Sequence, residues 1–76
     1  MKEQHYTKYR MIGLKISYYR KLRGLTQEQL AEKIDKNLAF IGAVEAHNVN
    51  RTVSLDTLFD IADALDVPAY KFLSDD

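Results

Sequence analysis

Residues 26–45 read TQEQLAEKIDKNLAFIGAVE, and this stretch decides how the chain folds. Apolar residues recur at helical spacing in each half of it, Leu30 and Ile34 in the first half and Ile41 and Val44 in the second. Ala31 supplies a small residue where two short helices would cross closely. Two short helices joined by a turn of three or four residues need this pattern, so the stretch is predicted to form a helix-turn-helix. Such a unit often places its second helix in the major groove of DNA.

Helical patterns continue on both sides of this unit. A first helix is predicted over about residues 7–23, with Gly24 as its C′ residue, because glycine adopts a left-handed helix end at little cost. The later helices begin with side chains that can accept a backbone N–H, namely Thr26 in a capping box with Gln29, then Asn37 and Ser54. A short fifth helix is predicted to follow Pro68 and to end near Leu73.

The predicted fold class is all-α. No stretch alternates with the period of a strand, so we expect a compact domain of five short helices. Residues 1–8 are expected to form a polar N-terminal arm and residues 9–76 the domain, with the helix-turn-helix at about residues 26–46. A chain of 76 residues is long enough for one such domain.

The composition excludes several classes of protein. There is no cysteine, which excludes disulfides and thiolate metal sites. The first residues are polar and do not resemble a signal peptide. No window approaches the roughly 18 apolar residues that a membrane span needs. We therefore expect a soluble, cytoplasmic protein that does not enter a membrane.

The charges are strongly polarised along the chain, although the formal net charge is zero. Residues 1–36 carry nine basic and four acidic side chains, a net charge of +5, whereas residues 37–76 carry two basic and seven acidic ones, a net charge of −5. Such a molecule can present one basic face to phosphate groups. The alternative interpretation is that two solvated helix faces of opposite sign simply attract each other.

The sequence offers no constellation of catalytic residues. His5 and His47 are far apart, and neither has a patterned carboxylate beside it. Phosphate-binding glycine loops, metal-ligand spacings and nucleophile elbows are all missing. The aspartates at positions 56, 60, 63 and 66 follow helical spacing, which favours a solvated acidic face over a metal site. We expect no enzymatic activity, no metal and no cofactor.

Four blocks of residues occur in an order and at a spacing that are typical of one family. They are Ile12-Gly13 with Ile16 and Arg20, then Gly24 to Ala31, then Ile41 with Val44-Glu45, and finally Ser54 to Val67. With these blocks, residues 12–73 resemble the XRE-type regulators, the lambda repressor/Cro-like helix-turn-helix family of bacteria. The resemblance implies a five-helix domain that binds operator DNA, usually as a dimer on a two-fold-related site. Arg20 and Glu45 are typical of the family and are interpreted as a structural pair that ties the recognition helix to the first helix.

The candidate DNA-binding residues lie in and around the predicted recognition helix, about Leu38–Ala46. The resemblance places a DNA-contacting glutamine at Gln27, where the helix N-terminus also offers free N–H groups to a phosphate. Arg51 is a candidate phosphate contact because it is nearly the only basic residue of the acidic half. The full set of candidates is Thr26, Gln27, Lys36, Asn37, Leu38, Ala39, Gly42, Ala43, His47, Asn48, Asn50 and Arg51.

The outward face of the predicted recognition helix departs from the family. Related proteins generally carry Ser, Arg, Gln, Asn or Lys there, whereas this chain has Leu38, Ala39, Gly42 and Ala43. Leucine and alanine side chains can contact thymine methyl groups, and Gly42 allows a close backbone approach to a groove or a partner. The alternative is that this apolar strip packs against another protein. Asp35 stands where a turn glycine is usual, and aspartate tolerates positive φ better than most residues.

Two kinds of partner follow from these observations, double-stranded DNA and a second copy of the chain. Dimerisation is expected through apolar residues near the C-terminal end, namely Phe59, Val67, Tyr70, Phe72 and Leu73. The alternative function is a protein-interaction module on the same scaffold, such as an antitoxin or a partner-binding regulator subunit. The fold alone does not decide between them.

Overall fold

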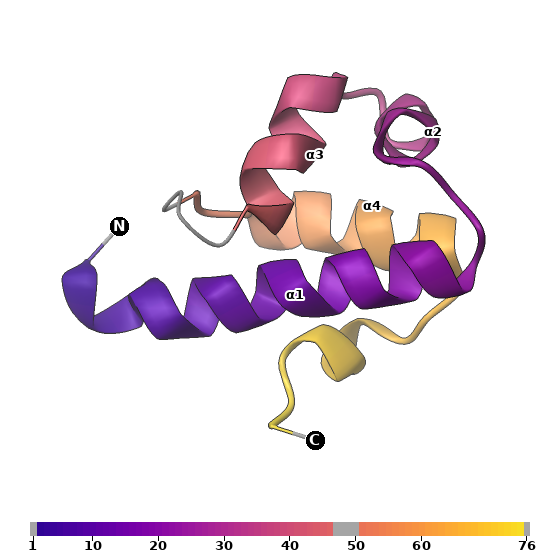
Figure 1. The fold of residues 1–76 in the computed structure, drawn as a ribbon. Coiled ribbons are helices and arrows are strands. Elements are labelled where there is room, and N and C mark those ends of the chain that lie inside the picture. The colour runs from indigo at the N-terminus through magenta and orange to yellow at the C-terminus, as the bar shows by residue number, and fades with distance from the viewer. Residues whose placement is uncertain (1, 47–50, 76) are drawn as a thin grey trace.

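The chain folds into an all-helical domain, shown in Figure 1. The structure is a computed structural model, and it describes residues 2–46 and 51–75. Its elements, with η for a 3-10 turn, are η1 (Glu3–His5), α1 (Tyr6–Leu22), α2 (Gln27–Lys33), α3 (Leu38–Glu45), α4 (Leu55–Leu65) and η2 (Ala69–Phe72). In Figure 1, α1 passes between the α2–α3 pair and the C-terminal turn η2, and α4 packs against α1. The predicted all-α fold class is confirmed.

The predicted fifth helix is a 3-10 turn instead. The turn η2 spans Ala69–Phe72, and the Lys71 N–H donates to the Pro68 carbonyl oxygen, three residues back, at 3.1 Å. The side chain of Phe72 is only 1% exposed. Because this side chain enters the core so soon after Pro68, the chain closes into a tight turn here and completes no longer helix.

The beginning of the chain is helical. Of the two interpretations of the polar arm, that it lies along DNA or that it extends the first helix, the structure favours the second, because residues 3–5 form η1 and α1 begins directly afterwards at Tyr6. The His5 N–H donates to the Lys2 carbonyl oxygen at 2.9 Å. No proline or glycine interrupts this segment, so the helical conformation extends toward the N-terminus. The result is an α1 of 17 residues.

The predicted N-caps are confirmed at Thr26, Asn37 and Ser54. At the start of α2, the Thr26 hydroxyl oxygen accepts from the Gln29 N–H at 3.0 Å, and the Gln29 side-chain oxygen accepts from the Thr26 N–H at 2.8 Å. At the start of α3, the Asn37 side-chain oxygen accepts from the Phe40 N–H at 2.8 Å. These bonds satisfy N–H groups that have no partner within a helix, so local sequence sets where α2, α3 and α4 begin.

Two residues with positive φ set the directions of the chain around α2. Gly24, with φ of 73°, ends α1 in the left-handed conformation that was predicted for it. Asp35 has φ of 57° in the turn between α2 and α3, as its tolerance of this conformation allowed. The turn is closed by the Lys36 N–H, which donates to the Ala31 carbonyl oxygen at 2.9 Å. These turns orient α2 and α3 as a helix-turn-helix.

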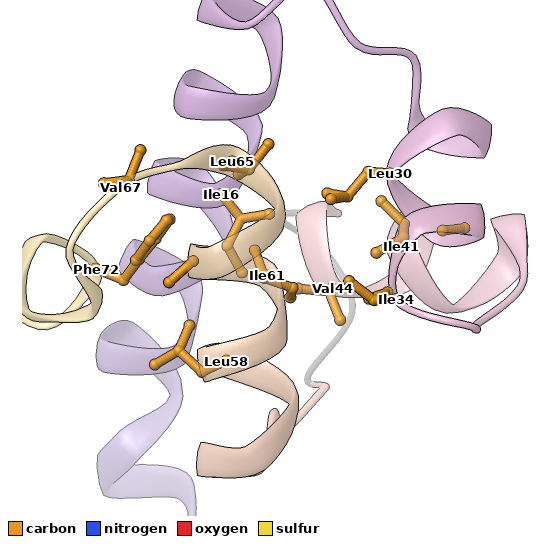
Figure 2. Packing of buried hydrophobic residues seen from close by; sticks show 12 residues of the cluster. Ile16, Leu30, Ile34, Ile41, Val44, Leu58, Ile61, Leu65, Val67 and Phe72 are labelled. Atoms are coloured by element: carbon orange, nitrogen blue, oxygen red, sulfur yellow. The ribbon is translucent and has the colours of Figure 1, made fainter.

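A single apolar core joins α1, α2, α3, α4 and the C-terminal turn. Figure 2 shows that its side chains converge from all of these elements. The four apolar residues that predicted the helix-turn-helix are all buried here, namely Leu30, Ile34, Ile41 and Val44. Ile16 of α1 and Ile61 of α4 are fully buried at the centre. Packing against α1 and α4 therefore fixes the position of the α2–α3 pair.

The backbones of α1 and α3 approach each other very closely at Gly13. A Cβ added to Gly13 would collide with the carbonyl oxygen of Val44 on α3. Only a residue without a side chain fits at this point, so the glycine lets the two helices approach with backbone almost in contact.

Candidate nucleic-acid interface

A buried ion pair anchors α3 to the rest of the domain. Arg20 on α1 donates to both carboxylate oxygens of Glu45, from Nε to Oε2 at 2.7 Å and from Nη2 to Oε1 at 2.9 Å. Its Nη1 donates to the Leu25 carbonyl oxygen at 2.6 Å. The two charged side chains are 9% and 5% exposed, so the bidentate geometry compensates for the loss of water. The predicted structural role of this pair is confirmed.

Gln27 extends this network to the beginning of α2. Its Nε2 donates to Glu45 Oε1 at 3.1 Å. Its Oε1 lies near Gly42, where an added Cβ would be 3.8 Å away. The Gln27 side chain therefore lies against α3, and the first turn of α2 and the middle of α3 share one surface. The predicted phosphate contact of Gln27 stays a prediction.

The surface of α3 that faces away from the core is apolar. Leu38 is 49% exposed, Ala39 is exposed, and Gly42 and Ala43 are half-buried. The helix has the sequence LAFIGAVE, so Glu45 is its one polar residue. Since Glu45 is held by Arg20 and Gln27, α3 has no polar side chain free to contact a ligand. The apolar character predicted from sequence therefore persists in the structure.

Two basic side chains flank this apolar surface and share one aromatic ring. The Lys36 ammonium lies 5.5 Å from the centre of the Phe40 ring, and the Arg51 guanidinium carbon lies 5.0 Å from it. Phe40 itself is half-buried and packs against the core. Cation–π contacts of this kind contribute about 0.5–1 kcal/mol at exposed sites. They hold both cations beside the first turn of α3.

A shallow hollow brings several of the predicted residues together. It is lined by Asp35, Lys36, Asn37, Ala39, Phe40, Ala43 and Arg51. Five of these were predicted DNA-binding residues. Phe40 was not predicted, because Lys36 lies in the turn before α3 and Arg51 beyond its end, so no helical spacing relates the three residues. The predicted residues His47, Asn48 and Asn50 lie outside the described part of the chain.

Other basic residues of the N-terminal half hold the fold together. The Lys15 ammonium donates to the Ser74 carbonyl oxygen. Arg23 donates from Nε to the Leu65 carbonyl oxygen at 2.7 Å and from Nη2 to the Asp66 carbonyl oxygen at 3.1 Å. These contacts lie on the C-terminal segment and at the end of α4. Part of the positive charge of residues 1–36 is therefore used within the fold.

The predicted dimerisation residues divide into two groups. Phe59, Tyr70 and Leu73 are 46%, 61% and 55% exposed and remain available to a partner. Val67 and Phe72, at 7% and 1% exposure, lie in the core instead. The prediction was wrong for these two because their side chains turn inward, and the Phe72 ring contacts the ring of Tyr19, with 5.4 Å between centroids.

Over residues 2–46 and 51–75, no three His, Cys, Asp or Glu side chains gather where they could hold a metal ion. In the same residues, no helix is both long and apolar enough to cross a membrane.

The chain is similar to known proteins over most of its length. The profile of the helix-turn-helix family matches residues 16–72. The crystal structure of C.AhdI, a restriction-modification controller protein from Aeromonas hydrophila, superposes with a TM-score of 0.81 and 31% identity, covering 90% of this chain and 96% of that chain. The crystal structure of NHTF, a hypothetical transcription factor from Neisseria, superposes with a TM-score of 0.80 and 26% identity, covering 97% of this chain and 80% of that chain. No curated protein matches the sequence significantly.

Proposed function

This chain belongs to the XRE-type helix-turn-helix family of DNA-binding transcriptional regulators, and we propose that it binds a two-fold-related operator as a homodimer with α3 in the major groove. The observation that carries the proposal is the pair of cations, Lys36 and Arg51, held on Phe40 beside the exposed surface of α3. Half-sites about one helical turn of DNA apart would suit such a dimer.

The rigidity of the α2–α3 unit supports this proposal. Arg20, Gln27 and Glu45 form one hydrogen-bonded network that joins α1, α2 and α3. A recognition helix held in this way presents its outer surface without further rearrangement. The N-terminus of α2 then faces the same ligand, and its free N–H groups can donate to a phosphate.

The two cations would contact the DNA backbone. Lys36 and Arg51 both line the shallow hollow next to α3, and both are exposed. Phosphate contacts position a protein on the duplex and make binding dependent on salt. Loss of one such contact is expected to weaken binding roughly fivefold near physiological salt and to lower the salt slope by about one.

The apolar side chains on the C-terminal segment would form the dimer contact. Phe59 on α4 and Tyr70 and Leu73 around η2 are large apolar residues that are about half exposed. In Figure 1, η2 lies across α1 from α3, so a partner bound there leaves the α3 surface open to DNA.

A protein-binding role is the second candidate function. The apolar surface of α3, with Leu38 49% exposed, favours it. A protein partner would bury this strip through contacts that depend little on salt, in contrast to DNA binding through Lys36 and Arg51.

The experiment that tests the proposal is selection of bound duplexes from fragmented DNA of the source organism and from a random library. We expect a two-fold-related motif to be enriched. On that motif, Lys36→Ala and Arg51→Ala should each weaken binding and flatten its salt dependence. Lys71→Ala is the matched control, because it removes the same charge from η2, on the other side of α1 from α3.

The outcomes separate the two candidate functions. Enrichment of a motif together with a selective effect of the Lys36 and Arg51 variants supports a sequence-specific regulator. DNA binding without an enriched motif, weakened by Lys71→Ala as much as by Lys36→Ala or Arg51→Ala, contradicts a sequence-specific regulator. That outcome favours a protein partner for α3.

A further inference from the structure

The surface of α3 that would meet the bases lacks the groups that usually read them. Base pairs are usually recognised by Arg, Asn or Gln side chains that make two hydrogen bonds to one base edge. The α3 residues on this surface are Leu38 and Ala39, which are exposed, and Gly42 and Ala43, which are half-buried. The side chains on this surface of α3 therefore cannot recognise bases through hydrogen bonds.

Within the described part of the chain, two amide side chains beside α3 are already engaged. The Asn37 side-chain oxygen accepts the Phe40 N–H at 2.8 Å as the cap of α3. The Gln27 side-chain nitrogen donates to Glu45 at 3.1 Å. Recognition of adenine by an amide uses both the oxygen and the nitrogen of that amide. If Asn37 made such a contact, α3 would lose its N-cap. If Gln27 made it, the Arg20–Glu45 network would lose its hydrogen bond to α2.

An apolar surface can still distinguish one base from the others. In the major groove, thymine alone presents a C5-methyl group, and alanine or other apolar side chains pack against it. Gly42 adds no side chain between Ala39 and Ala43, and the space above it is open except for the Gln27 amide. The strip of Leu38, Ala39 and Ala43 can therefore approach a row of methyl groups closely.

We propose that α3 reads thymine methyl groups, so that the half-site it contacts is defined by the positions of thymines rather than by hydrogen-bond patterns. This inference rests on the proposed function. The neighbouring charges favour DNA over a protein as the occupant, because Lys36 and Arg51 are held on the Phe40 ring, at 5.5 and 5.0 Å, and line the same hollow as Ala39 and Ala43. A DNA groove supplies methyl groups at its floor and phosphates along its edges, which matches this arrangement.

The test removes single methyl groups from the DNA. In the duplex obtained by selection, each thymine of a half-site is replaced in turn by deoxyuridine, which keeps the base pair and lacks only the C5-methyl group. We expect two or more central positions at which the replacement weakens binding about fourfold, the scale for one buried carbon. Replacements outside the half-sites serve as the DNA control.

The protein side of the test uses two leucines. With Leu38→Ala, replacing thymine by deoxyuridine should weaken binding less than twofold at one of these positions, because the side chain that packs on that methyl group is gone. Leu22→Ala is the matched control, since Leu22 is the last residue of α1 and is 59% exposed. With Leu22→Ala, each deoxyuridine replacement should weaken binding as much as it does with the wild-type chain. Circular dichroism confirms that both variants remain folded.

The results distinguish this inference from the proposed function. Position-specific penalties that Leu38→Ala removes establish methyl readout. Full affinity for the deoxyuridine duplexes, with the motif still selected, overturns methyl readout while sequence-specific binding stands. Failure to select any motif overturns both, and full affinity of Leu38→Ala for all duplexes shows that Leu38 does not contact the bases.

Discussion

Gly13 lies where α1 crosses α3, and its backbone lies so close to Val44 that a Cβ would meet the Val44 carbonyl oxygen. In an ordinary helix position, Gly→Ala stabilises by about 1 kcal/mol. Here the collision is with backbone, which cannot move aside as a flexible side chain could. We therefore expect Gly13→Ala to lower the free energy of unfolding by about 1–3 kcal/mol. For a domain of this size, that is a fall in Tm of roughly 4–8 °C per kcal/mol, measured by circular dichroism. An unchanged or higher Tm would mean that α1 and α3 are not in such close contact.

At the same scale, the Arg20–Glu45 pair joins residues from distant parts of the chain. The two residues are 25 positions apart, and nothing in local spacing predicts their contact. Their pairing was expected only because both residues are typical of the family. The contact of Phe40 with two cations was not predicted, because the family resemblance says nothing of it. Lys36 precedes Phe40 in the sequence and Arg51 follows it at a distance. Contacts between distant residues depend on the final packing, and a single sequence does not encode them in a readable pattern.

At the scale of elements, Gly42 affects the stability of α3, but unlike Gly13 it has room for a side chain. An alanine Cβ there would meet only the Gln27 amide oxygen, at an ordinary distance of 3.8 Å. We expect Gly42→Ala to stabilise α3 and raise the free energy of unfolding by up to about 1 kcal/mol. The same methyl group would keep α3 away from the floor of the groove, so affinity for the selected duplex should fall about tenfold or more, on the order of 1.4 kcal/mol. Thermal melting and fluorescence anisotropy measure the two effects.

The Gly42 prediction separates function from folding. A variant that is more stable and binds DNA less well indicates that the glycine serves the interface. A variant that is more stable and binds DNA equally well would contradict a close approach of α3 to the bases.

Helix boundaries were predictable to the extent that they are set locally. Thr26, Asn37 and Ser54 each accept an N–H three residues ahead, so the residues that decide these helix starts are adjacent in sequence. The C-terminal segment was not predictable in this way. Its 3-10 turn depends on the burial of Phe72 by distant elements, and the same packing removed Val67 from the exposed surface.

At the scale of the whole molecule, some of the basic residues that give the N-terminal half its positive charge stabilise the fold. Residues 1–36 have a net charge of +5, but Lys15, Arg20 and Arg23 make contacts within the fold. Arg23 in particular donates to the last carbonyl groups of α4, where a helix has unsatisfied acceptors and a negative dipole end. Lys36 and Arg51 come from opposite halves of the sequence and meet at one ring.

The proposed dimer is also a property of the whole molecule. We expect the wild-type chain to sediment as a dimer and Leu73→Arg to sediment as a monomer, because Leu73 is 55% exposed on the proposed contact. Loss of the second half-site contact should weaken operator binding by about 100-fold. Leu22→Arg is the control, since it places the same charge on an exposed leucine of α1. A wild-type monomer that binds each half-site independently would contradict the dimer.

The most direct test of the central claim, that α3 and the start of α2 form the DNA-binding surface, is a titration of the labelled chain with the selected duplex, followed by backbone amide shifts in NMR. The proposed function predicts the largest shifts at Gln27 and over residues 36–43, with Arg51 also affected. The amides of residues 8–15 in α1 should change little. Large shifts along α1 with α3 unchanged would contradict the assignment of this surface to DNA.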